Sequence, residues 1–217
     1  SIEMSARQLR YRYFEQLRND LGAETVCVGH HRDDAVETLL MNLMRGAGIH
    51  GLTGIRPRNG YIVRPLLCVS RDEIEAYLHA IGQPFVTDST NLEPDVLRNK
   101  IRLQLLPLME QIQPGTVNNL ARSSYYLSEA EKIYDAEIAR EKASFVSPHS
   151  THIIYHSSLI TSSPSPISLL HELLTPYGFN RTQTEQILAH LNDGSGREFT
   201  SSTHILVIDR DSFIIEP

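Results

Sequence analysis

The spacing of apolar residues predicts a chain of helices interrupted by a few short strands. Residues 1–21 carry apolar side chains at helical intervals, and Gly22 supplies a stop. Residues 25–29 are short, apolar and β-branched, which is typical of a buried parallel strand. Residues 34–45 return to helical spacing. A strand therefore ends just before a helix near residue 30, where open α/β sheets bind their ligands.

The same spacing predicts the elements that follow. We expect a strand at residues 61–67 with Pro65 near its end, and a helix that begins at the capping box Ser70-x-x-Glu73. Phe85 and Val86 are expected to be extended, with a polar loop over residues 87–91. Further helices are predicted at residues 96–109, kinked by Pro107, and at 118–144.

The last third of the chain differs in composition. Residues 147–168 are rich in Ser, Pro and His, which marks a boundary between domains. Two short helices are expected after it at residues 167–177 and 182–191, the second opened by a Thr182-x-x-Glu185 box. Residues 199–215 are strand-like, with a hairpin turn at residues 209–211. We expect three parts, spanning residues 1–100, 101–146 and 147–217.

The segment from Gly46 to Gly54 matches the pattern G-x-G-x-x-G by letter. A dinucleotide-binding fingerprint needs a strand before that pattern and a helix after it. Here the predicted element before it is a helix. We therefore expect the end of a helix that continues into a mobile loop.

Composition narrows the class of protein. The chain has 217 residues, 41% of them apolar, and no apolar run near the roughly 20 residues that span a bilayer. Cys27 and Cys68 lie far apart in apolar segments, so they are expected to be buried, reduced residues rather than a metal or redox pair.

The net charge of −6 is unevenly distributed. Residues 1–102 are neutral, with 13 basic and 13 acidic side chains, so the excess of acid lies in residues 103–217. Seventeen of the twenty basic residues are arginines, several of them clustered. Arginine suits phosphate recognition, so the overall acidity does not exclude an RNA partner.

The strongest candidate site is the run HHRDDAVET at residues 30–38. At about 100° per residue, Asp34 and Glu37 share one stripe of the predicted helix with Met41 and Arg45. The opposite face, expected to contact the core, carries Ala35, Val36, Leu39, Leu40 and Leu43.

Two neighbouring carboxylates repel unless a positive group lies between them. Three groups fit the pair Asp34 and Glu37: a Mg²⁺ ion, a substrate ammonium or a local arginine. Asp33 has a simpler reading, an acidic first turn that suits the helix dipole. Arg98 and Arg102 lie on one helix face, where they either bind phosphate or form a solvated surface.

Six motifs follow one another in a fixed order. They are Ala6-Arg7-x-x-Arg10-Tyr11, the run at 30–38, Arg45-Gly46-x-Gly48-x-x-Gly51-Leu52, Arg64-Pro65-Leu66-Leu67, Asp88-x-x-Asn91 and Arg98-Asn99-x-Ile101-Arg102. In these motifs the chain strongly resembles the tRNA(Ile)-lysidine synthetase family of the PP-loop ATP-pyrophosphatase group. The close resemblance covers residues 1–110, and a looser one continues to the end.

The resemblance implies an α/β fold: a truncated parallel-sheet PP-loop domain similar to the adenine nucleotide alpha hydrolases, a helical connector and a small α+β domain that binds tRNA or substrate. It also implies a ligase. ATP adenylates C2 of the wobble cytidine in the CAU anticodon of a tRNA(Ile), and the ε-amine of free L-lysine displaces AMP to give lysidine.

The resemblance also assigns roles to residues. Those expected to take part in catalysis are His30, His31, Asp33, Asp34 and Glu37, with Asp34 and Glu37 holding either the lysine ammonium or Mg²⁺. Those expected to bind substrate or phosphate are Arg10, Arg45, Gly46, Gly48, Arg98, Asn99 and Arg102. Cytoplasmic location, no membrane partner and self-association into a homodimer are also expected.

One feature of the family is absent. Its phosphate-binding motif, Ser-Gly-Gly-x-Asp-Ser, does not occur in the sequence, and no Walker-type loop replaces it. We therefore expect a fragment that does not by itself convert ATP to AMP and pyrophosphate.

Three other functions stay open at this point. A PP-loop tRNA thiolase would share the fold, although thiolation requires reactive cysteines. A metal-dependent phosphohydrolase could use His30, His31, Asp33 and Asp34, given further ligands such as His50 or His79. A non-catalytic RNA-binding module would bind tRNA without turning over ATP.

Overall fold

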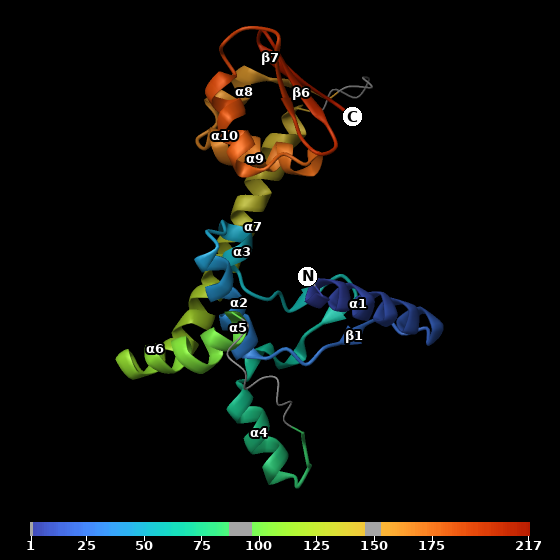
Figure 1. Ribbon diagram of the computed structural model, residues 1–217, viewed down its shortest axis with the longest axis vertical. Helices are drawn as coiled ribbons and strands as arrows, with labels where there is room; N and C mark the ends of the chain where they lie inside the picture. Colours follow the sequence, from blue (N-terminus) through green and yellow to red (C-terminus); the bar gives the residue numbers. More distant parts are fainter. Residues whose placement is uncertain (1, 87–96, 146–152) are drawn as a thin grey trace. The chain divides into compact units, whose positions relative to one another are not determined.

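A computed structural model describes residues 2–86, 97–145 and 153–217. The chain divides into two compact units, Ser1–Glu131 and Lys132–Pro217, and each is described by itself (Figure 1). The predicted loop at residues 87–91 and the motif Asp88-x-x-Asn91 lie outside the described residues.

The first unit is mostly helical around a very small sheet. Helix α1 (Ile2–Asp20) leads to strand β1 (Val26–Cys27), which pairs in parallel with β3 (Ile62–Val63). Strand β2 (Arg58–Asn59) pairs with β3 in the antiparallel direction. The α/β class is confirmed, with a mixed sheet whose strands are shorter than the predicted runs.

Helix α2 (Arg32–Met44) follows β1, as predicted. The next segment is not the expected mobile loop, because it contains the short helix α3 (Ile49–Leu52), which is held against α2. The amide of Asn42 donates to the carbonyl of Gly51 at 2.8 Å. A Cβ atom on Gly51 would lie 2.5 Å from the Cβ of Ala47, so glycine permits this close packing.

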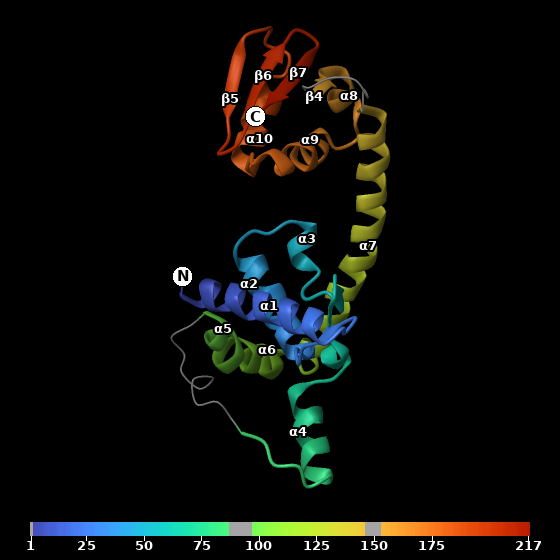
Figure 2. The same cartoon turned by 90° about the vertical axis from the view of Figure 1, so that its right-hand side faces the viewer.

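The segment after β3 was predicted as a continuing strand. Instead, it turns into the 3₁₀ helix η1 (Pro65–Cys68) directly at the proline. Helix α4 (Arg71–Ala80) begins at the predicted capping box: the Ser70 hydroxyl accepts from the Glu73 N–H at 3.1 Å, and the Glu73 carboxylate accepts from the Ser70 N–H at 2.6 Å. Both views show α4 extending away from the other helices of this unit (Figures 1 and 2).

The predicted helix at 96–109 is present but divided. It consists of α5 (Leu97–Lys100), the π-helical turn η3 (Ile101–Leu105) and α6 (Leu106–Ile112). Pro107 has no N–H to donate to the carbonyl four residues earlier, so the turn before it leaves the α-helical register. The long helix α7 (Thr116–Phe145) follows. Its first turn is capped by Glu110, whose carboxylate accepts from the N–H groups of Gly115 and Val117 at 2.7 Å each.

The second unit packs helices on one face of an antiparallel sheet with strand order β4-β7-β6-β5. Its strands are β4 (Ile153–His156), β5 (Arg197–Thr200), β6 (Ile205–Asp209) and β7 (Ser212–Glu216), and its helices are α8 (Ser157–Ser162), α9 (Pro166–Leu174), η4 (Thr175–Tyr177) and α10 (Arg181–His190). The α9 and α10 helices and the hairpin turn confirm the predictions. Strand β4 was not predicted.

The capping box of α10 lies two residues earlier than predicted. The Asn180 side chain accepts from the Gln183 N–H, and the Gln183 side chain accepts from the Asn180 N–H, both at 3.0 Å. The predicted Thr182 and Glu185 lie inside the helix.

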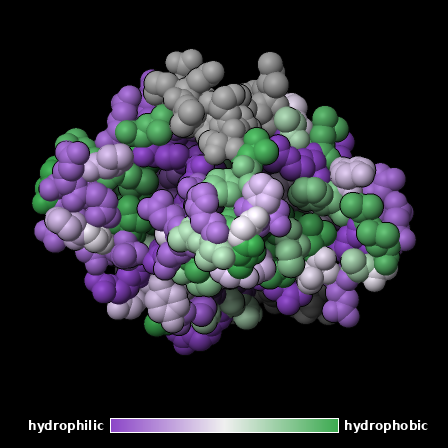
Figure 3. All heavy atoms as spheres, turned by 90° about the horizontal axis from the view of Figure 1, so that it is seen from below, coloured by the Kyte–Doolittle hydropathy of each residue, from purple (hydrophilic) through white to green (hydrophobic). Residues whose placement is uncertain are grey.

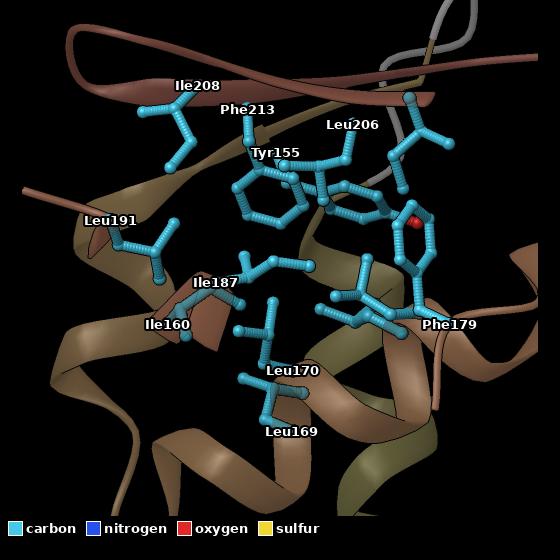
Figure 4. Close-up of a cluster of buried hydrophobic side chains, with 13 residues drawn as sticks. Tyr155, Ile160, Leu169, Leu170, Phe179, Ile187, Leu191, Leu206, Ile208 and Phe213 are labelled. Carbon is cyan, nitrogen blue, oxygen red and sulfur yellow. The ribbon is translucent and has the colours of Figure 1, made fainter. Parts of the chain in front are cut away.

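Alternate residues of the central strands form the core of the second unit. Leu206 and Ile208 of β6 and Phe213 and Ile215 of β7 face the helices, and the Phe213 ring stacks on Tyr155 with 5.1 Å between centroids (Figure 4). Thirteen buried apolar residues form this cluster. Their packing makes the second unit an ordinary hydrophobic domain.

The solvent exposure of three side chains shows that two predictions were wrong. Cys27 and Cys68 are exposed and free rather than buried, because the strand around Cys27 is only two residues long. Leu43, predicted to face the core, is 55% exposed near the end of α2. On the face shown in Figure 3, hydrophobic side chains are scattered among hydrophilic ones. No helix among the described residues is long and apolar enough to cross a membrane.

Candidate active site

The site begins where β1 ends and α2 starts. His31 is the N-cap residue of α2, and its backbone N–H donates to the Asp34 carboxylate at 3.0 Å. The two nitrogens of the His31 ring lie 3.5 Å from the Asp33 carboxylate and 3.4 Å from the Asp34 carboxylate. The predicted histidine and carboxylates are therefore in mutual contact at the first turn of the helix.

Asp33 has a structural contact. Its carboxylate accepts from the backbone N–H of Arg71 at 2.9 Å, at the first residue of α4. This bond satisfies a helix N–H that has no partner within the helix. Asp33 therefore holds α4 against the start of α2.

The partner of the two remaining carboxylates is an arginine. Arg102 of η3 donates to both oxygens of Glu37, from Nε at 2.6 Å and from Nη2 at 2.9 Å. Nη2 also lies 3.3 Å from Asp34. Of the three positive groups that the sequence left open, the structure contains the arginine.

Apolar packing brings these segments together across more than sixty positions of sequence. Val36 and Leu40 of α2 pack against Ile101 and Leu106 of the divided helix. Glu37 lies beside them and is 0% exposed. The expectation of an apolar face against the core with the carboxylates elsewhere was therefore wrong for Glu37, because the helix carrying Arg102 covers that side as well.

A second arginine completes this cluster. Arg98 of α5 donates from Nη2 to the Thr38 hydroxyl at 2.9 Å, and its Nε lies 3.6 Å from Glu37. Thr38 in turn donates to the backbone carbonyl of Asp34 at 2.8 Å. Two cations thus hold one buried carboxylate in a fixed orientation.

Burial and pairing act in opposite directions on these groups. Burial raises the pKa of Glu37 above its ordinary value, although the bonds from Arg102 oppose this. Burial alone would lower the pKa of Arg102, but the carboxylates of Glu37 and Asp34 more than offset it, so that pKa is raised. Arg102 therefore stays charged.

His30 lies in a different electrostatic environment. Burial lowers its pKa, and the charges of Arg64, Arg7 and Arg98 lower it further, while Asp34 opposes them. The ring is therefore neutral at pH 7. Its Nδ1 atom is buried and has no hydrogen-bond partner among the described residues.

A cavity of about 430 Å³ opens beside this cluster. Its walls come from α1, the end of β1 and the start of α2, and they include Arg10, Tyr11, His30 and Asp34. The structure thus brings the predicted Arg10 to the site.

A strand end with paired histidine and carboxylates, next to a polar cavity, is the arrangement expected of a nucleotide-dependent α/β enzyme. Comparison with known families decides which one. The PP-loop domain matches residues 1–109 of the chain, and the TilS substrate binding domain matches residues 148–217. The chain belongs to the PP-loop domain family.

Individual relatives agree with this result. The chain is 47% identical to the tRNA(Ile)-lysidine synthase of Bacteroides thetaiotaomicron and 40% identical to that of Porphyromonas gingivalis, over all of its length in each case. It is 49% identical to that of Parabacteroides distasonis over 97% of its length. These alignments cover 50%, 47% and 48% of the respective relatives, so the chain spans about half the length of the curated relatives it matches. The resemblance inferred from the motifs is confirmed.

Some of the predicted binding residues lie away from this PP-loop site. Arg45 is exposed at the end of α2, eleven residues beyond Asp34, or about 16 Å at 1.5 Å per residue. Gly46 follows it with φ +73°, a conformation that favours glycine, and Gly48 is the N-cap of α3. Asn99 lies half-buried on α5 beside Arg98.

Arg64 and Thr38 contribute contacts that the sequence did not assign. Both residues belong to the six motifs, but the motifs alone give neither residue a role. The signal for Arg64 was a basic residue between an apolar strand and a proline, in the run Arg64-Pro65-Leu66-Leu67. The structure buries this arginine in the PP-loop domain.

Proposed function

We propose that this chain belongs to an enzyme that makes lysidine at the wobble position of a tRNA(Ile) with a CAU anticodon. In the first step, the C2 oxygen of cytidine attacks the α-phosphorus of ATP, and pyrophosphate leaves. In the second step, the ε-amine of free L-lysine attacks C2 and loses a proton, and AMP leaves with the C2 oxygen. The product therefore contains cytidine and lysine less one water.

One observation carries this proposal: His30, Asp34, Glu37 and Arg102 converge at the start of α2 within the PP-loop domain. Three curated relatives that match nearly the whole chain are named tRNA(Ile)-lysidine synthase. Because the chain spans only about half of each, the activity of the whole enzyme stays a proposal.

The geometry suggests a task for each group. Glu37 fixes the guanidinium of Arg102, and a fixed cation suits the negative charge that develops on the departing AMP. Neutral His30 can accept a proton from the attacking amine, and the nearby carboxylate of Asp34 attracts the lysine ammonium. Arg10 and Arg98 suit phosphate oxygens.

The carboxylates do not fit a Mg²⁺ ion while Arg102 is in place. Both oxygens of Glu37 accept from Arg102, and those of Asp34 lie within reach of Arg102 and the His31 N–H. The proposed reaction therefore uses no metal ion bound between Asp34 and Glu37. ATP remains the nucleotide substrate of the proposed reaction.

We also propose how the chain is organised for its substrates. Residues 1–100 form the catalytic part, 101–146 the helical connector and 147–217 the part that binds tRNA, a division supported by the match of a substrate binding domain to residues 148–217. The enzyme acts in the cytoplasm, where free lysine and tRNA are found.

Self-association is a further proposal. Exposed apolar side chains recur every four residues along α1 at Leu9, Tyr13 and Leu17, and Leu21 follows directly after the helix. Such a stripe favours association with a second copy. Light scattering on the purified protein should give the mass of a dimer, and a monomer mass at all concentrations would contradict this.

The experiment that tests the reaction uses the complete gene product that carries this sequence. It is incubated with ATP, lysine and an unmodified tRNA(Ile) transcript, and the nucleosides are analysed by mass spectrometry. We expect a cytidine product heavier by lysine less one water, formed only when ATP and lysine are both present. The same tRNA with uridine at the wobble position serves as the matched control and should stay unmodified.

Other outcomes identify the alternative functions. A product in which sulfur replaces oxygen would indicate a thiolase, which the exposure of Cys27 and Cys68 permits. Binding of tRNA without any ATP-dependent product would indicate an RNA-binding module. Either result would overturn the lysidine proposal.

A further inference from the structure

A second cavity of the PP-loop domain is lined by arginines. It has a volume of about 290 Å³, and its walls include Arg7, Arg56, Arg64, Arg98 and His30. We call it the arginine cavity. It shares Arg7 and His30 with the cavity beside Asp34, so the two adjoin.

Arg64 is the buried cation of this cavity. Only 7% of its surface is exposed, and its Nη1 donates to the carbonyl of Arg56 at 2.8 Å. Its Nε atom is buried without a hydrogen-bond partner, and Arg64 forms no ion pair with any described residue. A buried charge is costly unless an opposite charge accompanies it. The buried donor therefore indicates an anion that is supplied from outside the chain.

The nearby carboxylates are engaged with other cations. Glu37 accepts from Arg102, and Glu131 accepts from Arg56 at 2.7 Å and contacts His50 at 2.6 Å. Asp34, whose charge acts on the pKa of His30, contacts Arg102 and His31. The lining of the arginine cavity itself contains no carboxylate among the described residues, so positive charge is in excess there.

The backbone around Arg64 is fixed in place. Its N–H donates to the carbonyl of Pro57 at 2.9 Å, and Pro65 begins η1 directly after it. The guanidinium is thus presented from the end of β3 rather than from a free loop. Such preorganised donors suit a doubly or more highly charged oxyanion.

We propose that Arg64, with His30, Arg7 and Arg98 around it, binds a phosphate group of the substrates in the arginine cavity. This inference rests on the proposed function, which supplies two sources of phosphate: the polyphosphate of ATP and the RNA backbone at the anticodon. Both present the same oxyanion chemistry to the guanidinium.

The test compares Arg64→Met with Arg58→Met, an exposed arginine on β2 that serves as the matched control. Binding of inorganic pyrophosphate and of an anticodon stem–loop RNA to the complete gene product is measured by calorimetry. We expect Arg64→Met to weaken at least one of the two ligands about tenfold or more, the effect of losing a charge-assisted hydrogen bond. Arg58→Met should bind both as the wild type does.

The ligand that is weakened identifies the source of the phosphate. If Arg64→Met binds only pyrophosphate more weakly, the phosphate comes from the nucleotide. If it binds only the RNA more weakly, the phosphate comes from the tRNA backbone. Equal binding of both ligands by Arg64→Met and the wild type would overturn the inference.

Two further variants keep the test decisive if Arg64→Met fails to fold. Arg7→Gln changes an exposed residue of α1 that lines the cavity, and it should weaken the same ligand several-fold without loss of structure. Arg64→Lys keeps the charge and should restore part of the binding. Wild-type affinity in Arg7→Gln together with unfolding of both Arg64 variants would assign Arg64 to structure alone and overturn the inference.

The readouts separate this inference from the proposed function. If the gene product makes lysidine but its binding of phosphate does not depend on Arg64, only the inference about Arg64 fails. If phosphate binding depends on Arg64 and no lysidine forms, only the proposed function fails.

Discussion

The two units of the molecule bury different kinds of side chain. In the part of the second unit that the structure describes, the core has thirteen apolar residues, and the buried polar residues are Ser157 and Thr184. Among the described residues of the first unit, the apolar cluster has four buried members, and the charged groups Glu37, Arg64 and Glu131 are buried as well. Hydrophobic burial therefore explains the second unit, whereas the first unit also buries charges, of which Glu37 and Glu131 are paired with arginines.

This contrast follows from the energetics of burial. Apolar side chains stabilise a fold in proportion to the area removed from water. Buried ion pairs contribute little net stability, because the loss of hydration offsets their attraction. The first unit accepts this cost at Glu37 and Arg64, which the two proposals place at the site, and also at Glu131, which pairs with Arg56. Its charges thus indicate function, while the core of the second unit indicates stability.

The largest effect is expected from removing one member of the buried ion pair. Arg102→Met leaves Glu37 buried without its main partner and should destabilise the first unit by about 3–5 kcal/mol. Urea unfolding, followed by probes in each unit, measures this. The double variant Glu37→Leu, Arg102→Met removes both charges and should recover most of the stability. Failure of the double variant to recover would show that apolar packing, and not charge pairing, dominates here.

A core truncation should affect the second unit by a similar or slightly smaller amount. Leu206→Ala leaves a cavity at a residue that is 0% exposed and should cost about 2–5 kcal/mol. The neighbouring Ile205 on the same strand is 37% exposed, so Ile205→Ala should cost less than about 1 kcal/mol. Equal effects of the two variants would contradict the assignment of the two faces of β6.

Helix caps should behave alike in both units, because capping is local. Ser70→Ala in the first unit and Asn180→Ala in the second each remove the acceptor for one helix N–H and should each cost about 1 kcal/mol. Thermal unfolding of the two variants gives the values. A difference of several kcal/mol between them would mean that a cap supports more than its own helix.

The smallest effect is the dependence of stability on pH. The pKa of His30 is lowered in the folded state below its ordinary value of 6.5, so the unfolded chain takes up the proton first. Its contribution to stability is complete above pH 6.5 and is lost as the pH falls towards the folded pKa. The slope cannot exceed about 1.4 kcal/mol per pH unit.

Denaturant unfolding at several pH values from 7.5 to about 5 tests this. His30→Gln should remove part of the slope. An identical slope in the wild type and His30→Gln would show that His30 is not in the electrostatic environment described above.

Much of the fold follows from local sequence patterns. Helical spacing located α1, α2, α4, α7, α9 and α10, and the box at Ser70 set the start of α4 correctly. The segment that forms β4 was hidden by its composition, because Ser, Pro and His surround three apolar residues whose strand partner β7 is about sixty positions away. The π-helical turn was signalled by Pro107 only as a kink, since the sequence does not specify which register the backbone takes.

The sequence predicted the site residues that lie close together along the chain, near the start of α2. It did not predict the contacts made by residues that are distant in sequence. The strand end identified His30, and the helix stripe identified Asp34 and Glu37, which lie within one turn of each other. The pairing of Glu37 with Arg102 depends on how α2 packs against Ile101 and Leu106, which no local pattern encodes. The same tertiary packing buries Arg64, whose role therefore became visible only in the structure.

The most direct test of the central claim is lysidine formation by the variant Glu37→Gln of the complete gene product. This change keeps the shape of the side chain and removes the charge that orients Arg102. The matched control is Glu75→Gln, a half-buried residue of α4 that pairs with Arg71. The account predicts that Glu37→Gln folds and loses about 100-fold or more in rate, while the control keeps the wild-type rate. Wild-type lysidine formation by folded Glu37→Gln would contradict it.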